Sequence, residues 1–128
     1  MPAPIVLVSN QRIQPGRVEE YKAKYAAAAE RFRTGRPNTL AHSAYLSEDA
    51  TQVSVVMAFL DAEAMEVHLR GLGSSPQQAQ EFMQFVSLQI YGMPTAACLD
   101  LIRQMVGPDV PVTMKPEVVA GYIRLGSE

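Results

Sequence analysis

The sequence predicts an α+β fold in which one antiparallel sheet carries its helices on a single face. Strand-like segments alternate with helix-like segments along the chain. In addition, the strands are apolar on both of their alternating faces; residues 5–8, for example, are apolar without a break. A strand with one face in water would instead alternate apolar with polar residues. Both faces of the sheet are therefore expected to be covered.

The first half of the chain is expected to form a strand, a helix and a strand hairpin. The strand at residues 4–12 ends in a Gln-Pro-Gly turn at 14–16, which is a typical helix entry. Apolar residues then recur three or four positions apart, as on one buried helix face, until Gly35 and Pro37 end the helix. Strands are predicted at 40–47 and 51–60, with a turn at 48–50.

The second half is expected to contribute two further helical regions and two strands. Asp61 is placed to cap a helix that runs through Gly71, and Pro76 restarts a helix that continues toward Phe85. A strand at 86–91 and a helix capped by Thr95 and ended by Gly107 come next. Residues 109–115 are interrupted by proline and fit an edge or a connection. The last strand is predicted at 118–125.

This order is ferredoxin-like, βαββαβ, with an added C-terminal helix and strand. At 128 residues, the chain is expected to form a single domain over 1–128. Helices cover only one face of such a sheet, so the other apolar face needs a second cover. A second copy of the chain is the simplest cover, which predicts a homodimer through the sheet face.

Composition and charge narrow the classes of partner and compartment. The chain has 11 Lys and Arg against 13 Asp and Glu, a net charge of -2, and no basic block, so nucleic acid is not an expected partner. We find no leader and no apolar run of about 20 residues, which predicts a cytoplasmic protein without a membrane partner. The single cysteine, Cys98, is expected to be a packed thiol.

Three segments resemble the antibiotic biosynthesis monooxygenase-like family. They are the end of the first strand with the following turn (9–17), the end of the third strand with the next helix start (58–65), and His-Leu-Arg at 68–70. The likeness covers about residues 4–91, and segments 91–94 and 121–124 are similar to the extension of longer members. The resemblance implies a dimeric α/β barrel with a cavity for a hydrophobic or aromatic small molecule.

The resemblance also implies a range of activities. The family includes oxygenases that convert polycyclic phenols to quinones without a cofactor, haem-degrading enzymes, and members with no known activity. The first group needs a group that handles the phenol proton, a stabiliser for the resulting anion, and a dry apolar chamber. Haem degradation is not expected, because the chain has no tryptophan and Gln77 and Gln78 stand where the axial histidine would lie.

Three polar residues are the main candidates for the site. His68, in the second helix, is the expected catalytic acid or base, because a neutral imidazole can take a phenolic proton. Asn10, on the first strand, and His42, on the second, are expected to orient the substrate. Two of them have a structural alternative: His68 as a residue that caps or bonds the nearby turn at Gly71, and His42 as a satisfied sheet residue.

Further candidates could contact a substrate. Each lies in a predicted strand and carries a hydroxyl or a guanidinium group. These residues are Tyr45, Tyr91, Tyr122, Arg12 and Arg124. Tyrosines on strands more often pack, and an arginine near a strand end more often lies at the solvent rim. The two histidines are 26 residues apart and no phosphate-binding loop is present, so neither a metal nor a cofactor is expected.

The sequence therefore predicts a small-molecule-binding homodimer that acts as a cofactor-independent monooxygenase on an aromatic or polyketide-like substrate. Two alternatives remain open. The chain could be a non-catalytic binding or interaction module of the same fold. It could also be an isomerase or lyase that uses the same histidine to move a proton without oxygen.

Overall fold

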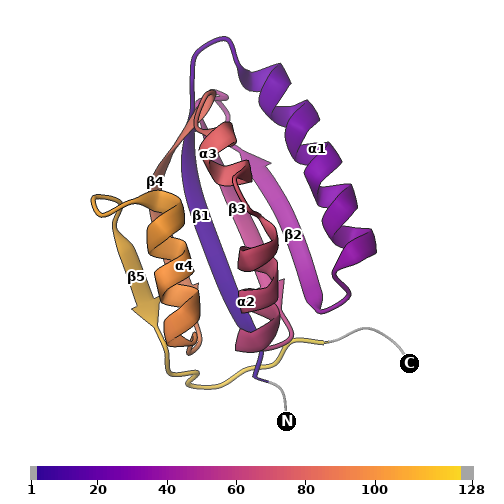
Figure 1. The fold of residues 1–128 in the computed structure, drawn as a ribbon, viewed down its shortest axis with the longest axis vertical. Coiled ribbons are helices and arrows are strands. Elements are labelled where there is room, and N and C mark those ends of the chain that lie inside the picture. The colour runs from indigo at the N-terminus through magenta and orange to yellow at the C-terminus, as the bar shows by residue number, and fades with distance from the viewer. Residues whose placement is uncertain (1–2, 125–128) are drawn as a thin grey trace.

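The computed structural model describes residues 3–124. The chain order of its elements is shown in Figure 1. The strands are β1 (Ile5–Ile13), β2 (Thr39–Leu46), β3 (Gln52–Phe59), β4 (Met83–Tyr91) and β5 (Val112–Lys115). The helices are α1 (Val18–Gly35), α2 (Ala62–Gly71), α3 (Ser75–Ala79) and α4 (Ala96–Val106). The predicted α+β class and the βαββαβ order with an added helix and strand are confirmed.

The five strands form one sheet in the order β2-β3-β1-β4-β5. β1 lies at the centre and pairs antiparallel with both β3 and β4, with a register shift against β4 between Asn10 and Gln11. β5 pairs parallel with β4, so the sheet is mixed rather than wholly antiparallel. The parallel direction follows from α4, which carries the chain back across the sheet before β5 begins.

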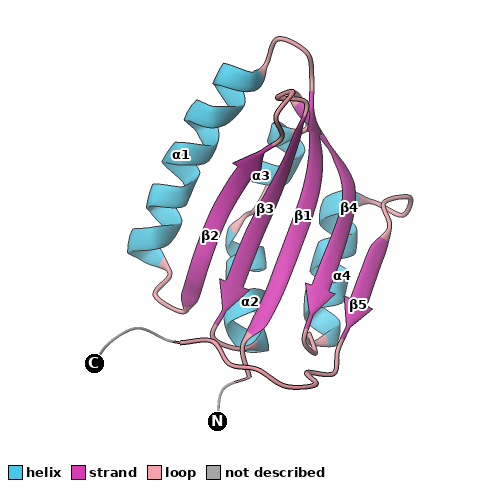
Figure 2. Ribbon diagram, turned by 180° about the vertical axis from the view of Figure 1, so that it is seen from behind, coloured by secondary structure: helices cyan, strands magenta, loops and turns pink. Residues whose placement is uncertain are grey.

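The two faces of the sheet have different surroundings. α2, α3 and α4 cover one face, whereas the view from behind shows that no described helix covers the other (Figure 2). α1 lies alongside the β2 edge and contacts that strand. We call these the helix-covered face and the open face. A space remains between α1 and the α2–α3 region, above the sheet.

The core lies between the sheet and the covering helices. Alternate residues of β1 and β3 are buried on this side, while the residues between them on the open face are half-buried. Leu7, Phe59, Met65, Leu88 and Ile90 are completely buried and pack in one cluster. Cys98 is also buried, as predicted, and its thiol contacts the Ala62 carbonyl oxygen.

Both predicted helix caps are present. The Asp61 carboxylate accepts a hydrogen bond from the Ala64 amide at 2.8 Å, and the Thr95 hydroxyl accepts one from the Cys98 amide at 3.1 Å. These bonds fix where α2 and α4 begin. Neither these helices nor the others between residues 3 and 124 combine the length and apolar character that a membrane span needs.

Two predicted elements are wrong in extent or position. The helix expected to run from Pro76 toward Phe85 ends at Ala79, because β4 already begins at Met83, where it pairs with Ile13. Tertiary pairing there prevails over local helical preference. The strand expected at 118–125 is absent over 118–124, and residue 125 lies outside the described residues. β5 at 112–115 occupies the sheet edge instead.

Candidate functional site

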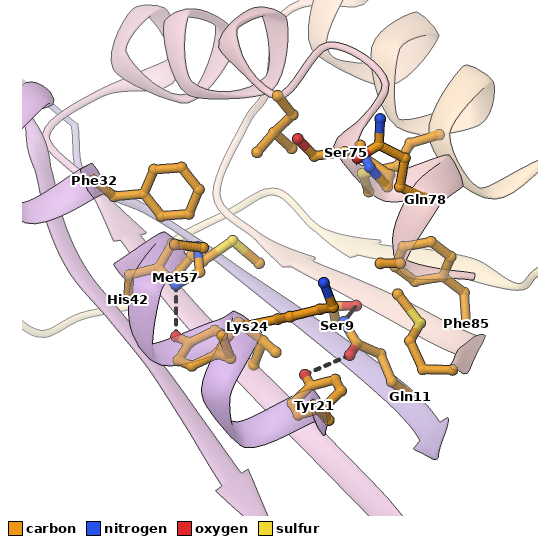
Figure 3. A pocket seen from close by; sticks show the side chains of 18 of the residues that line it. Ser9, Gln11, Tyr21, Lys24, Phe32, His42, Met57, Ser75, Gln78 and Phe85 are labelled. Atoms are coloured by element: carbon orange, nitrogen blue, oxygen red, sulfur yellow. Dashed lines mark hydrogen bonds between the residues drawn. The ribbon is translucent and has the colours of Figure 1, made fainter. Parts of the chain in front are cut away.

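A cavity of about 670 Å³ lies between α1 and the α2–α3 region, over the helix-covered face of the sheet (Figure 3). Most of its lining is apolar. These side chains include Leu7, Val55, Met57, Phe32, Leu69, Leu72, Phe82, Met83, Phe85 and Met105. Both the volume and the apolar lining are typical of small-molecule sites. The methionines add adaptable surface against which a planar molecule can pack.

Two histidines form a pair in this cavity. His42 lies on β2 opposite Met57, and His68 lies on the inner face of α2, only 1% exposed. Their ring centroids are 5.2 Å apart. Phe32 of α1 packs against both, with centroids 4.8 Å from His42 and 4.7 Å from His68. The two histidines and Phe32 therefore bring together β2, α2 and α1, which are far apart in sequence.

Each histidine makes a hydrogen bond through Nδ1. The Tyr25 hydroxyl lies 2.7 Å from Nδ1 of His42. Nη1 of Arg36 lies 2.7 Å from Nδ1 of His68 and also donates to the His68 carbonyl oxygen at 3.1 Å. The alternative in which His68 simply bonds to the turn at Gly71 is therefore not what the structure shows.

Burial keeps both imidazoles neutral. It lowers the pKa of His68 to about 3, with further lowering by His42 and Arg36. It lowers the pKa of His42 to about 4, with a smaller contribution from Arg36. Burial also raises the pKa of Tyr25 to about 12. Groups with these values are uncharged at neutral pH, and each imidazole is a weak base there.

A second cluster of polar side chains lines the cavity at β1. The Tyr21 hydroxyl donates to Oε1 of Gln11 at 2.7 Å, and Nε2 of Gln11 donates to the Ser9 hydroxyl at 3.0 Å. All three residues are at least 93% buried, and Figure 3 shows their bonds as dashed lines. Sequence reasoning missed this chain of bonds. The available signal was that Ser9 and Gln11 fall in phase with the buried residue Leu7.

The strand residues of these two polar clusters, His42 on β2 and Ser9 on β1, lie apart across the cavity floor. Leu7 and His42 both pair with Met57, so two strand spacings separate them, and Ser9 lies two residues further along β1. This places the backbones of His42 and Ser9 about 12 Å apart. The apolar side chains of Met57 and Val55 occupy the floor between them.

The predicted site residues divide between the two faces. His68 and His42 line the cavity. Asn10 lies on the open face, because it is out of phase with the buried residues of β1, so it does not share a site with His68. The remaining candidates do not line the cavity either. Tyr45, Tyr91 and Arg12 pair in phase with the open-face residues, and Tyr122 and Arg124 lie exposed in the segment after β5.

Asn10 forms a polar network on the open face. Its amide nitrogen donates to the Ser87 hydroxyl at 3.1 Å and to Oε1 of Gln89 at 2.8 Å, and its amide oxygen accepts from the Ser54 hydroxyl at 2.6 Å. These bonds link β3, β1 and β4. The expectation that Asn10 orients a substrate beside His68 is therefore corrected: its amide is engaged by its own neighbours on the other face.

Metal-ligating side chains do not gather in groups of three or more within residues 3–124. Charged residues also line the cavity, and they are Glu20, Lys24, Arg31 and Glu81. Its uncharged polar side chains carry imidazole, hydroxyl and amide groups. Such groups can hydrogen-bond a ligand oxygen and keep an otherwise apolar ligand in one orientation.

Comparisons with known proteins identify the fold. MupZ from Pseudomonas fluorescens is similar with a TM-score of 0.71 and 18% identity, over 93% of this chain and 94% of that one. A protein from Bacteroides thetaiotaomicron named as an antibiotic biosynthesis monooxygenase has a TM-score of 0.58 and 21% identity, over 68% and 84% of the two chains. A protein so named from Caulobacter crescentus has a TM-score of 0.51 and 14% identity, over 85% and 80%.

These similarities define a class of fold. The chain has the ferredoxin-like fold of antibiotic biosynthesis monooxygenase proteins, which confirms the predicted resemblance at the level of fold. The part of this chain left unmatched by MupZ is shorter than α4, so that match includes at least part of the added C-terminal helix. No protein-family model matches the sequence, and the search of curated proteins finds no match.

Proposed function

We propose that the chain binds a small, largely apolar aromatic molecule in this cavity and oxygenates it without a bound cofactor. The observation that carries the proposal is the cavity itself: a space of about 670 Å³ with apolar walls and a buried, neutral histidine pair. The backbones of His42 and Ser9 lie about 12 Å apart with an apolar floor between them, and this spacing suits a fused-ring molecule that carries more than one oxygen.

The proposed reaction converts a phenol to a quinone. The ionised phenol is electron-rich and reacts directly with dioxygen at a ring carbon that carries hydrogen. One oxygen atom becomes the new carbonyl oxygen, and the other leaves as water with the phenolic hydrogen and the ring hydrogen. The substrate supplies all four electrons. The protein's contribution is to hold the ring, exclude water and stabilise the phenolate oxygen.

Burial changes the role expected for His68. A base that acts near neutral pH needs a pKa near that pH, whereas the pKa of His68 is lowered to about 3. We therefore assign His68 to the substrate oxygen as a hydrogen-bonding group rather than as the acceptor of its proton. His42, 5.2 Å away between ring centroids, contacts the same part of the ligand in this proposal.

We further propose that two copies of the chain pair through their open faces. The centre of this face is uncharged and partly apolar, with half-buried Val6, Val8, Val56 and Ala58. The amide of Asn10 is already satisfied by its neighbours, so a partner could cover it without leaving it unpaired. A cytoplasmic location remains a prediction from the sequence.

A non-catalytic binding module is the second candidate. It is favoured by the low basicity of both histidines and by the lack of a charged acid or base among the buried lining residues. The cavity would then hold its ligand unchanged. The isomerase or lyase alternative needs an effective base, which makes it the least supported of the three.

Oxygen uptake separates these functions. The purified protein is mixed with a panel of fused-ring phenols, and oxygen consumption and quinone absorbance are followed together. Equal consumption of oxygen and formation of quinone, lost in His68→Ala, supports oxygenation. Tight binding of a phenol without oxygen uptake supports the binding module, and turnover without oxygen supports the isomerase or lyase. An absence of binding across the panel contradicts the proposal.

A further inference from the structure

We propose that Arg36 fixes His68 in the tautomer that carries its proton on Nε2, so that His68 presents an N–H donor to an acceptor oxygen of the ligand. Arg36 is thus a positioning residue for the site. The inference rests on the proposed function for the existence of a ligand, and it adds what the ligand must offer at this point: an oxygen that accepts a hydrogen bond.

The contact between Arg36 and His68 determines the tautomer. A guanidinium carries only donors, so the Nδ1 atom that lies 2.7 Å from Nη1 must offer a lone pair. A neutral imidazole with a lone pair on Nδ1 has its proton on Nε2. The same Nη1 also donates to the His68 carbonyl oxygen at 3.1 Å, which ties the guanidinium to both the ring and the backbone of His68.

The surroundings of Arg36 hold the guanidinium in this position. It lies over the ring of Phe32, 4.8 Å from its centroid. Gly71 leaves the space on the helix side, since a Cβ built there would collide with the guanidinium. Among residues 3–124, no carboxylate forms an ion pair with Arg36. His68 therefore takes the contact that a carboxylate would otherwise make.

The Nε2 atom of His68 is the ring nitrogen left for a ligand. In the described part of the chain, no buried side-chain nitrogen or oxygen lacks a hydrogen-bond partner. The hydrogen bond of the ring uses Nδ1, so Nε2 keeps a slight exposure on a residue that lines the cavity but is only 1% exposed overall. The adjacent Arg36 charge polarises the ring and makes this N–H a better donor, especially to a negatively charged oxygen.

The tautomer can be measured without any variant. In protein with 15N-labelled histidine, two-bond proton–nitrogen correlation spectra at neutral pH distinguish a protonated ring nitrogen from an unprotonated one. We expect protonated Nε2 and unprotonated Nδ1 for His68, assigned by its loss in His68→Gln. A proton on Nδ1, or on both nitrogens, would overturn the inference whatever the cavity binds.

The donor can be tested with a coloured phenol. The probe is 4-nitro-1-naphthol, whose anion absorbs visible light, so that its ionisation can be titrated while bound. We expect the wild-type protein to favour the anion by roughly tenfold or more, which appears as a lower pKa for the bound probe. Arg36→Gln should lose most of this preference, and Arg36→Lys should keep part of it.

Two further variants make the experiment specific. Gly71→Ala displaces the guanidinium without altering its charge, so it should weaken anion preference although alanine favours a helix. Arg33→Gln is the matched control, because Arg33 is an exposed arginine of α1 that pairs with Glu30. Equal anion preference in wild type, Arg36→Gln and Gly71→Ala would overturn the inference. If no protein binds the probe, the proposed function fails at this ligand, while the tautomer still decides the role of Arg36.

Discussion

Polar side chains on the two faces of the sheet make different kinds of contact. Both carry apolar residues interrupted by polar ones, and in β1 the polar residues Ser9 and Asn10 are neighbours. Ser9 lies under the helices, joins Gln11 and Tyr21, and lines a cavity. Asn10 lies on the open face and bonds to residues of β3 and β4. A one-residue step along a strand thus moves a polar group from the candidate site to the candidate interface.

The cover of each face determines the function available to it. On the helix-covered face, α1 lies along the sheet edge and leaves a space that its neighbours do not fill. On the open face no described helix contributes, and the polar groups satisfy one another. The first arrangement suits a small molecule, and the second suits a broad, flat partner.

Adjacent substitutions in β3 should show the largest difference between the two faces. Val55 is 4% exposed on the helix-covered face, whereas Val56 is half-buried on the open face. We expect Val55→Asp to lower the free energy of unfolding by about 3 kcal/mol or more, because it buries an unpaired carboxylate. Val56→Asp should cost the monomer only about 1 kcal/mol but dissociate a dimer. Urea unfolding and light scattering measure both, and equal effects of the two variants would contradict the assignment of faces.

Removal of one polar group from each face should separate ligand chemistry from assembly. We expect His68→Ala to lower turnover of a true substrate on the order of a hundredfold, as for loss of a donor to a developing anion. Asn10→Ala is the control on the other face and should leave turnover per folded chain within about twofold. Steady-state oxygen uptake gives both values. Unchanged turnover in His68→Ala would remove this residue from the reaction.

Acid should destabilise the helix-covered face through its histidines. The pKa values of His68 and His42 are lowered from 6.5 to about 3 and about 4, so the unfolded state binds more protons below pH 6.5. Stability is therefore complete above about pH 6.5 and is lost as the pH falls, by up to about 1.4 kcal/mol per pH unit for each histidine.

The window from about pH 6.5 down to about 5.5 isolates this effect, because the carboxyls of Glu20 and Glu30, whose folded pKa values are lowered from 4.5, add their own slope only as the pH approaches 4.5. Urea unfolding across this window measures the slope. His42→Gln should make it shallower. A slope that is the same in the variant and the wild type would show that His42 is not buried as a neutral group.

The smallest effect is expected where neither face is involved. Tyr122 is 82% exposed in the segment after β5, and no strand forms there among residues 116–124. We expect Tyr122→Ala to change the free energy of unfolding by less than about 0.5 kcal/mol and to leave ligand affinity unchanged. Thermal unfolding measures the stability, and titration with 4-nitro-1-naphthol measures the ligand affinity. A large loss in either would mean that this segment belongs to the sheet or the site after all.

The fold was more predictable than the site. Turn and cap residues such as Asp61, Thr95 and Gly107 act locally, and the helices begin and end where these residues predicted. The segment 83–85 was mistaken for helix because its strand character comes from pairing with β1, which is far away in sequence. The last strand also depends on tertiary pairing: residues 112–115 pair with β4 at the sheet edge, whereas the sequence predicted a strand at 118–125.

The site depends on facts that no local pattern contains. His68 and His42 were identified from the sequence because each lies beside apolar residues, and because an imidazole can take a phenolic proton. Their partners were not, since Arg36 looked like part of a helix stop and Tyr25 like core. Asn10 shares a strand face with Val6 and Val8, but the sequence does not say which face the helices cover.

Native mass spectrometry of the freshly purified protein can show whether the helix-covered face holds a small molecule and the open face holds a second copy. We expect a dimer of the 128-residue chain that retains up to one small aromatic molecule, native or added, per copy. We also expect Val56→Asp to be a monomer that still binds the added molecule. A wild-type monomer that takes up no aromatic compound would contradict both expectations.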